Sequence, residues 1–422
     1  MRVHDFFTRS TPGFEAYDIK DWKLKKIIEV YIRRKEGEPR LCCRCGHQLN
    51  KAKVGEHKLT IRSLDAMIVK VFYKYKRQKH HCSNCNKARS EKIDFLSNES
   101  PTKTKEYVWW LGKMFEFSPV SRVAEFTDNN QMTMWRLDFE RMRRMFQHYK
   151  IPPIKKICVD EVYARSKKYH AKECRDNQFF TIITDLETSR VIWVSESRNK
   201  AALDEFFHIM GEDRCAEIEV VAMDQHDPYR ASVKDNCPNA EVVWDKFHIM
   251  QSFEKALNEE RKDIHSSLDK KSKLNDLACG RYKFLFLKKE KDRTKKEQRH
   301  FEQVARENTK FYAMELIKER ILHIFYERDE FDALWILTEV ESWINFNDFK
   351  NLKSWFKHFL QNWDTIKNYY KHRVTSATAE GVNNVIKTVK KRAFGYRNMA
   401  YFKLKILQVC GYLNSKYIPM EF

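Results

Sequence analysis

The sequence predicts a multidomain α/β protein whose mixed-sheet core is interrupted by an all-helical insertion and preceded by two smaller modules. Three observations predict this fold class. Two C-x-x-C pairs lie near the amino end, helical spacing begins at Thr102, and strands alternate with a helix after Pro152-Pro153 before a long basic helical tract. The expected parts are an amino-terminal segment at 1–40, a zinc-binding module at 41–95, a helix-turn-helix domain at 96–150, the core at 151–248 with 372–410, and the helical insertion at 249–371.

The composition favours a polyanionic partner. Lysine and arginine total 80 against 59 acids among 422 residues, which gives a formal net charge of +21. Basic side chains that neutralise phosphates release counterions, so this excess favours nucleic acid, although a merely soluble basic protein could share it. No apolar run reaches the roughly 20 residues that span a bilayer, and the first residues lack the apolar region of a secretory signal. We therefore expect a cytoplasmic protein with no membrane partner.

The clustered cysteines predict one structural zinc ion. The pairs are Cys42 with Cys45 and Cys82 with Cys85. The sequence has 11 cysteines, an odd number, and those beyond position 85 are scattered singly. Four thiolates suit a closed tetrahedral zinc site, and the interval between the pairs is strand-like, as in a zinc-ribbon hairpin. Cys43 is a spare thiol. The nearby histidines are expected to face solvent or phosphate; they are His47, His80 and His81.

A strand between the two pairs has basic residues on one face. At period two, Lys70, Lys74 and Lys76 share a face with Phe72, while Val69, Val71, Tyr73 and Tyr75 form the other. Lysines interleaved with an aromatic ring suit a strand laid against a nucleic acid backbone. A solvated face on an edge strand is an equal alternative. The candidate DNA contacts here are Lys70, Lys74, Lys76 and Arg77.

A helix-turn-helix arrangement is predicted next. Apolar residues at helical spacing follow Thr102, Ser118-Pro119 is expected to cap and begin a second helix, and a third runs from Gln131 to about Tyr149. Arg136 of the third helix is the candidate DNA contact. Asp128 lies in the turn where glycine is common, so any helical hairpin remains an alternative.

The core is predicted from the order of its elements. Strands are expected to Asp160, from Phe179 to Thr184 and from Val191 to Val194. A helix from about Lys200 to Met210 follows, and then strands ending at Asp224 and Trp244. Three strands, a helix and two more strands is the order of a ribonuclease-H-like sheet. In that layout the first and fourth strands are neighbours, so Asp160 and Asp224 would emerge side by side.

A late helix is expected to carry a third acid, Glu380. Its predicted buried stripe is Val382, Val385, Ile386 and Val389. Glu380, Asn384 and Lys387 would share another face, which suits a metal beside a phosphate backbone. The stretch 390–397 is predicted to be a phosphate-contacting loop. The candidate contacts in this region are Lys387, Lys391, Arg392 and Arg397.

Three carboxylates in these settings suit a pair of Mg²⁺ (or Mn²⁺) ions, since hard cations prefer carboxylate oxygen and two of them can clamp an in-line attack on a phosphodiester. The competing acid Asp185 lies in a predicted hairpin turn and is expected to be structural. Asp245 and His248 stand three apart at a strand-to-helix junction, where they could orient the site.

Five segments together resemble insertion-sequence transposases of the ISL-three family. They are Val159-Asp160-Glu161, Asp224 followed by Tyr229, Trp244-Asp245-Lys246-Phe247-His248, Thr378-Ala379-Glu380-Gly381-Val382-Asn383-Asn384, and Lys391-Arg392-Ala393-Phe394-Gly395-Tyr396-Arg397-Asn398. The resemblance extends from about Leu41 to Val409 and also takes in the cysteine pairs and the helix-turn-helix segment.

The resemblance implies a DDE transposase in which Asp160, Asp224 and Glu380 hold two metal ions and the four paired cysteines hold zinc. It implies that Asp245 and His248 support the core and bind no metal. The implied activity is cleavage at the terminal inverted repeats of an insertion sequence and strand transfer into target DNA, by a homodimer or higher assembly in the bacterial nucleoid. Two other functions stay open: a DNA-binding regulator with an inactive nuclease-like core, and a repair or resolving nuclease.

Overall fold

The computed structural model describes residues 7–66, 68–164, 178–374, 377–414 and 416–418. The chain divides into two compact units, one of Met1–Lys150 with Lys390–Phe422 and the other of Ile151–Val389. Each unit is described by itself below. The five-part division expected from the sequence stays a prediction. One of the scattered cysteines, Cys174, lies outside the described residues.

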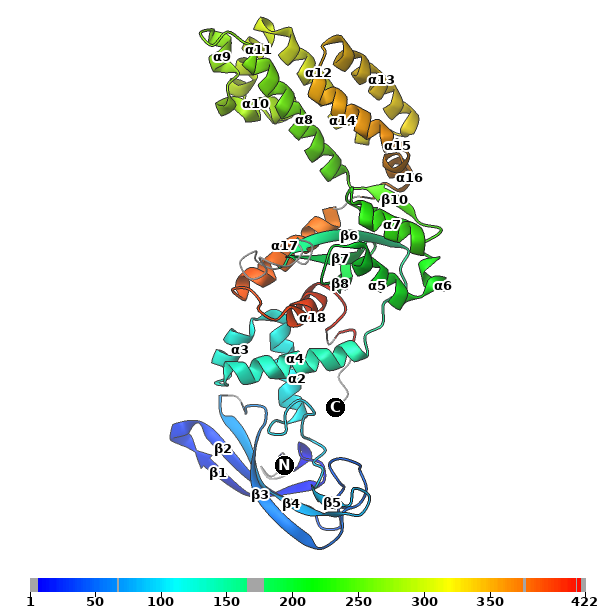
Figure 1. The fold of residues 1–422 in the computed structure, drawn as a ribbon. Coiled ribbons are helices and arrows are strands. Elements are labelled where there is room, and N and C mark those ends of the chain that lie inside the picture. The colour runs from blue at the N-terminus through cyan, green and yellow to red at the C-terminus, as the bar shows by residue number, and fades with distance from the viewer. Residues whose placement is uncertain (1–6, 67, 165–177, 375–376, 415, 419–422) are drawn as a thin grey trace. The chain divides into compact units, whose positions relative to one another are not determined.

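The first unit contains a mixed β-sheet with both antiparallel and parallel pairs (Figure 1). Its strands run in the order β1-β2-β4-β3, with β5 paired to β4. The strand bounds are β1 Phe14–Trp22, β2 Ile27–Arg34, β3 Lys53–Arg62, β4 Lys70–Cys82 and β5 Lys87–Ser90. β3 and β4 form the hairpin expected between the cysteine pairs. Val71, Tyr73 and Tyr75 of β4 are buried in the core of this sheet, so the predicted two-residue alternation is confirmed.

Three helices follow in the same unit, and a fourth returns to them from the end of the chain. The bounds are α2 Lys105–Phe117, α3 Val120–Phe126, α4 Gln131–Gln147 and α18 Met399–Cys410. The prediction that Ser118 caps α3 is wrong. Ser118 ends α2, and the residue before α3 is Pro119, which has no side-chain capping bond because it has no side-chain acceptor. Asp128 adopts a φ of 51°, the left-handed conformation that glycine would supply in this turn.

A buried charge network holds α4 against α18. The carboxylate of Asp138 accepts hydrogen bonds from Arg141 (3.1 Å) and from the hydroxyl of Tyr401 (2.7 Å), and Lys405 lies 3.0 Å away. Lys405 also donates to the carbonyl of Phe115 at the end of α2. Three helices of this unit are therefore joined through one carboxylate and one ammonium group.

The second unit contains a five-stranded mixed sheet in the order β10-β9-β6-β7-β8. The strand bounds are β6 Lys156–Tyr163, β7 Phe179–Asp185, β8 Arg190–Ser195, β9 Val220–Met223 and β10 Glu241–Trp244. β6 pairs with β9 in parallel and with β7 in antiparallel orientation. The predicted adjacency of the first and fourth strands is confirmed. β6 does not end at Asp160 as expected, because β7 continues to pair with it as far as Tyr163.

Three helices accompany this sheet. They are α5 Lys200–Met210, α6 Glu212–Cys215 and α7 Asp227–Asn236. α5 has the predicted bounds, and the side chain of Asn199 caps it by accepting from the amide of Ala202. The prediction that Asp185 is structural is also confirmed, since its carboxylate accepts from the amide of Glu187 and the hydroxyl of Thr188 in the β7–β8 turn.

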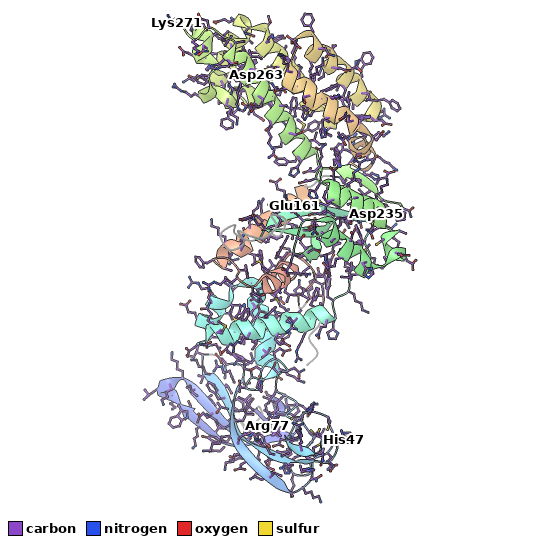
Figure 2. The ribbon with its side chains drawn as sticks, in the orientation of Figure 1. His47, Arg77, Glu161, Asp235, Asp263 and Lys271 are labelled. Atoms are coloured by element: carbon purple, nitrogen blue, oxygen red, sulfur yellow. The ribbon has the colours of Figure 1, made fainter. Side chains whose placement is uncertain are left out.

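Every regular element described between β10 and α17 is helical, as predicted for the insertion. The α-helices are α8 Lys246–Ser266, α9 Lys273–Leu277, α10 Lys283–Leu287, α11 Lys295–Glu307, α12 Thr309–His323, α13 Glu330–Phe346, α14 Lys350–Gln361, α15 Trp363–Ile366 and α16 Asn368–His372. Short 3-10 turns lie at η4 Gly280–Tyr282, η5 Glu290–Asp292 and η6 Ile324–Tyr326. Asp263, labelled on α8 in Figure 2, accepts a 2.7 Å hydrogen bond from Asn351 of α14.

The helical tract leaves the sheet after β10 and returns to the same strand. Asn368 of α16 donates to the carbonyl of Val242 (2.9 Å), and Glu241 accepts from Lys371 (2.6 Å) and pairs with His372 (2.5 Å). The chain then enters α17, Ala377–Arg392. Among the described residues, none of the helices combines the length and apolar character needed to cross a bilayer.

Candidate active site, zinc cluster and basic surfaces

Asp160 and Asp224 lie at the same level on neighbouring strands. Val159 of β6 is the register partner of Met223 of β9, and the strands are parallel. Each aspartate is the next residue along its strand direction, so both follow the last paired position. The pairing of β6 with β9 therefore brings two acids that are distant in sequence together beyond the last paired residues of two central strands.

The surroundings of Asp160 raise its pKa. One oxygen accepts from the amide of Glu161 (2.6 Å) and the other from the side-chain amide of Asn383 (2.7 Å). Burial raises the pKa of the Asp160 carboxyl to about 6, and the negative charge of Asp224 adds to the rise. Two like charges held close at a partly buried site are an arrangement that a divalent cation would relieve.

Helix α17 is anchored beside this pair of strands (Figure 1). Ala379 packs in one apolar cluster with Cys158 of β6 and Ala222 of β9, the positions two residues before Asp160 and Asp224. Its neighbour Glu380 lies in the first turn of α17, with an exposed side chain. The sheet and the helix thus bring the three predicted acids to one region of the unit. Among the described residues, however, their carboxylates do not form a group within 4.8 Å of one another.

The buried face of α17 differs from the predicted one. Val385 is 45% exposed, so its place in the predicted buried stripe is wrong, whereas Val382, Asn383 and Ile386 are buried. The phase is set by the contact of Ala379 with the strands, because the residues three, four and seven positions later fall on the same side. Asn383, and not Asn384, therefore faces the site. Sequence reasoning missed this residue, although its spacing from Ala379 was a usable signal.

His248 bridges Asp224 and Asp245. Its Nδ1 atom lies 2.6 Å from Asp224 Oδ1 and 2.8 Å from Asp245 Oδ2. Asp245 is buried and caps α8 by accepting from the amide of Phe247. The hydrogen bonds to Asp224 and then to Asp245 raise the pKa of His248 to about 10. The three side chains are close enough to hold a metal ion, but the two carboxylates instead share one imidazole nitrogen.

The four paired cysteines form one compact cluster. Their sulfur atoms all lie within 4.8 Å of one another, with 3.9 Å between Cys42 and Cys85 and 3.5 Å between Cys45 and Cys82. A side-chain hydrogen bond with Asn84, followed by a backbone bond at His47, lowers the pKa of the Cys45 thiol to about 5. Four sulfur ligands at this spacing suit tetrahedral Zn²⁺.

Among the described residues, the metal-ligating group at this site consists of the four paired cysteines, without Cys43 or a histidine. Cys43 is exposed, as expected of a spare thiol. His47 is exposed, but the prediction that His80 faces solvent or phosphate is wrong. His80 is buried, and its ring nitrogens bond to the carbonyl of Ala52 and the side chain of Gln78.

The candidate DNA contacts of β4 differ in how far they are already engaged. Lys70 pairs with Asp128, and Lys74 pairs with Glu29 at 3.0 Å. Arg77 donates two hydrogen bonds to the carbonyl of Glu91. Lys76 is exposed. Of the four, Lys76 has the side chain most available to a ligand.

The remaining candidate contacts are exposed on helices. Arg136 lies on α4, and Lys387, Lys391 and Arg392 lie on α17. The prediction that the whole 390–397 stretch is a loop is wrong, because α17 continues to Arg392. The turn begins only after it, with Phe394 and Gly395 at positive φ. Arg397 in that turn is exposed as well.

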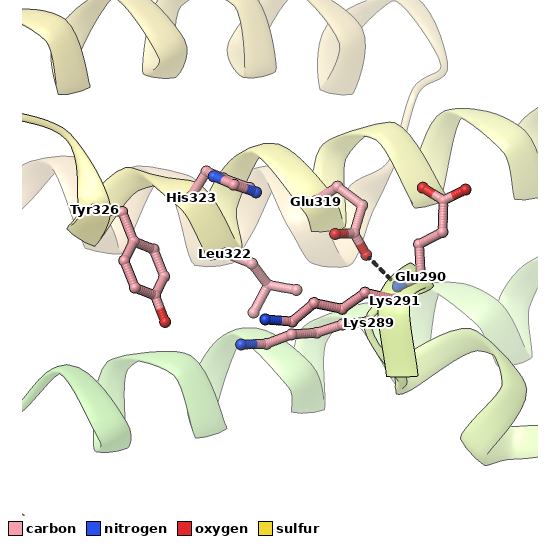
Figure 3. Close-up of a pocket in the computed structure, with 7 residues that line it drawn as sticks. All are labelled: Lys289, Glu290, Lys291, Glu319, Leu322, His323 and Tyr326. Carbon is pink, nitrogen blue, oxygen red and sulfur yellow. Dashed lines mark hydrogen bonds between the residues drawn. The ribbon is translucent and has the colours of Figure 1, made fainter. Parts of the chain in front are cut away.

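The basic helical tract contains a pocket of about 640 Å³ between η5 and α12 (Figure 3). Lys289 and Lys291 extend side by side toward Leu322 and Tyr326, and Glu319 accepts from the amide of Glu290. Within the described residues neither lysine has a salt bridge. From its sequence, this basic tract could form either a solvated surface or a surface near DNA, and both interpretations stay predictions.

Comparison with known proteins gives a consistent picture. Residues 157–406 match a family model of the DDE type and ISL-three group, described as a transposase. The chain is 21% identical over 413 residues to the transposase for insertion sequence element IS1001 of Bordetella parapertussis, across 94% of this chain and 96% of the relative. It is 22% identical over 286 residues, 61% of each chain, to the transposase for insertion sequence element IS1557 of Mycobacterium tuberculosis.

Proposed function

Because the chain belongs to the ISL-three family of DDE transposases, we propose that it binds the terminal inverted repeats of its own insertion sequence and catalyses metal-dependent DNA cleavage and strand transfer. The observation that carries this proposal is the pairing of β6 with β9. It sets Asp160 beside Asp224, and α17, which carries Glu380, is bonded to Asp160 through Asn383.

The sheet order supports a ribonuclease-H-like core. In β10-β9-β6-β7-β8, the first strand lies at the centre between the second and the fourth, and only β7 runs against its neighbours. The sequence predicted, for such a core, that the first and fourth strands are neighbours. The helical tract enters after the last strand and ends before α17, so it separates Glu380 from the two aspartates in sequence without disrupting the sheet.

Asp160, Asp224 and Glu380 would hold two divalent cations, Mg²⁺ or Mn²⁺. Bound there, such ions supply Lewis acidity to the attacking and leaving oxygens of a phosphodiester. The donors fit, because hard cations prefer carboxylate oxygen, and the pKa of Asp160 is raised by burial first and by the charge of Asp224 second, both of which a bound cation would offset. Asn383 fixes the orientation of Asp160 by donating to one of its two oxygens, which leaves further lone pairs on both for a ligand.

Asp245 and His248 would position Asp224. Asp245 is buried and held by the first turn of α8, and His248 connects it to the carboxylate of Asp224. The rotamer of Asp224 is therefore set by the junction between the sheet and the helical tract. This supports a role for the pair in the core rather than as metal ligands.

The first unit would bind the element ends. Its four-cysteine cluster, held by one structural zinc ion, would fix the β3–β4 hairpin, while Arg136 of α4 and the exposed Lys76 would contact DNA. A helix-turn-helix role for α2 to α4 is supported by the short turn at Asp128 between α3 and α4. Two element ends must be joined in transposition, so we include a homodimer or higher assembly on DNA.

The test uses purified protein, a labelled duplex of the element end and Mg²⁺. We expect nicking at the end, followed by joining to a target duplex. Asp160→Asn and Glu380→Gln should abolish both products while DNA binding persists. Asp213→Asn, an exposed acid of α6, is the matched control and should behave as wild type.

Other outcomes would identify the two rival functions. End binding without any nick by the wild-type protein would favour a regulator with an inactive core. Cleavage that follows DNA shape and gives no joined product would favour a repair or resolving nuclease.

A further inference from the structure

A second pocket, of about 330 Å³, lies in the first unit between the outer face of the β3–β4 hairpin and the turn that joins α3 to α4. We call it the hairpin–turn pocket. Its polar lining is Thr60, Arg62, Lys70, Thr102, Lys103, Asp128 and Asn129. Arg62 is the register partner of Phe72, and Thr60 of Lys74, so the pocket opens on the face of β4 that carries Lys70, Lys74 and Lys76.

Two nitrogens of the Arg62 guanidinium are buried in this pocket without a hydrogen-bond acceptor among the described residues. Arg62 is 7% exposed, and its guanidinium lies over the rings of Phe72 (5.0 Å) and Tyr107 (5.2 Å). Nη2 is 2.6 Å from a carboxylate oxygen of Asp65, but the angle is not that of a hydrogen bond, and neither Nη1 nor Nη2 has an acceptor. Guanidinium groups present a donor fork that matches phosphate oxygens.

Lys103 adds a second buried cation. The segment that carries it pairs with Arg62, and Lys103 is 8% exposed. Burial, and then the charge of Arg62, lower the pKa of the Lys103 ammonium group. No salt bridge to Lys103 is found within the described residues. Asp65 balances the charge of Arg62 from outside the lining, and Asp128 pairs with Lys70, so the lining keeps the buried charge of Lys103 in excess. A buried cation beside unused guanidinium donors is costly, so the lining is suited to an anion.

Asp128 is the acid at the rim. It pairs with Lys70, yet its side chain is 79% exposed and its backbone is left-handed. An exposed ion pair contributes little free energy, so an anion that enters the pocket can displace this carboxylate from Lys70 at low cost.

We propose that the hairpin–turn pocket binds one phosphate group of the DNA backbone, held by Arg62 and Lys103 with Lys70 at the rim. This inference rests on the proposed function, because it names a contact of the DNA that the first unit would bind. The choice of DNA follows from the location. The pocket lies between the lysine face of β4 and the turn before α4. A DNA strand that lies on either element therefore passes over the pocket, and one bound phosphate would hold the DNA to both elements.

Lys103→Met separates this role from a structural one. Removing an unpaired buried cation should raise the melting temperature in phosphate-free buffer, whereas removing a structural lysine would lower it. The same variant should bind an element-end duplex about tenfold more weakly. The slope of log K against log salt should fall in magnitude by about 0.9, the contribution of one phosphate. Arg62→Gln should show the same binding losses, and Asp128→Asn should bind more tightly.

Arg33→Gln is the matched control, because Arg33 lies on β2 outside the pocket lining, where it makes an exposed pair with Glu15 and lies over the ring of Tyr17. The inference is overturned if Lys103→Met and Arg33→Gln give the same affinity and salt slope. It is equally overturned if inorganic phosphate raises the wild-type melting temperature while Lys103→Met leaves DNA binding unchanged, since the pocket would then serve a free anion. If wild-type protein binds unrelated duplex as tightly as element ends, the proposed end recognition fails, and the slopes on unrelated duplex still test the pocket.

Discussion

The side-chain amide of Asn383 donates a 2.7 Å hydrogen bond to Asp160, a residue 223 positions away in the chain. Together with the contact of Ala379 on the strands, this bond fixes the rotation of α17 on the sheet, and with it the position of Glu380 one turn earlier. The orientation of one proposed metal ligand and the placement of another therefore depend on the same amide group.

Asn383→Ala should weaken metal-dependent cleavage without weakening DNA binding. A hydrogen bond to a charged group contributes about 1.5–3 kcal/mol, so a loss of roughly tenfold or more in cleavage rate is expected at limiting Mg²⁺. Titration with Mg²⁺ should show a higher midpoint. The neighbouring Asn384→Ala is the control, because Asn384 is exposed on the same helix. Equal losses in both variants would contradict the assignment of Asn383.

Asp160→Asn should stabilise the protein at neutral pH while it abolishes cleavage. The pKa of Asp160 is about 6 in the folded protein against roughly 3.9 in an unfolded chain. A raised folded-state pKa contributes stability below pH 4 that is lost as the pH rises through 6. Asparagine has no such titration, so the advantage of the variant should grow between about pH 4 and pH 6 and then level off.

Thermal melts in Mg²⁺-free buffer without chelator measure this difference, with Asp213→Asn as the control that should show none. A variant that is less stable than wild type by the same amount at every pH would show that Asp160 is held by packing and not by charge.

The sheet could be predicted from the sequence because each strand is marked by residues that are close together in the chain. Apolar runs that end in Asp160 and Asp224 mark two buried strands, and the order of strands and helix places those strands together. The helix α17 could be predicted for the same reason. Its rotation could not, because valines at 382 and 385 are equal candidates for burial until the contact of Ala379 with Cys158 and Ala222 is known.

Polar contacts between residues that are distant in the sequence could not be predicted either. Nothing near Asp138 in the sequence indicates that its partners are Tyr401 and Lys405 of α18. The hairpin–turn pocket is a similar case, since Arg62 and Lys103 become neighbours only when their two segments pair. The cysteine cluster was predictable because the two C-x-x-C pairs state the ligand chemistry in the sequence itself.

Cys45→Ser should remove the zinc ion and unfold the hairpin module. Structural zinc supplies roughly 10–16 kcal/mol of apparent binding free energy, and here it would join the start of the module to the end of β4. Metal analysis should fall from about one zinc per chain, and end binding should be lost. Cys43→Ser, at an exposed thiol two residues away, should keep both. Full zinc content in the Cys45 variant would exclude this residue as a ligand.

Asp138→Ala should be among the most destabilising single changes in the first unit. Burial alone would raise the pKa of Asp138, but the charges of Lys405 and Arg141 lower it overall, so the carboxylate is ionised and paired. Its removal leaves two buried cations without their shared partner, at a cost of about 3–5 kcal/mol. Urea unfolding followed by tryptophan fluorescence measures the loss.

Glu140→Gln is the matched control for Asp138, because Glu140 lies two residues away on α4 and pairs with Arg143 and Arg144 at the surface. Exposed pairs of this kind contribute about 0–1 kcal/mol. The double variant Asp138→Leu with Lys405→Met should recover much of the stability, because an apolar pair needs no partner, although Arg141 would then keep one unpaired charge. If Asp138→Ala and Glu140→Gln unfold at the same urea concentration, the α4–α18 contact is held by apolar packing alone.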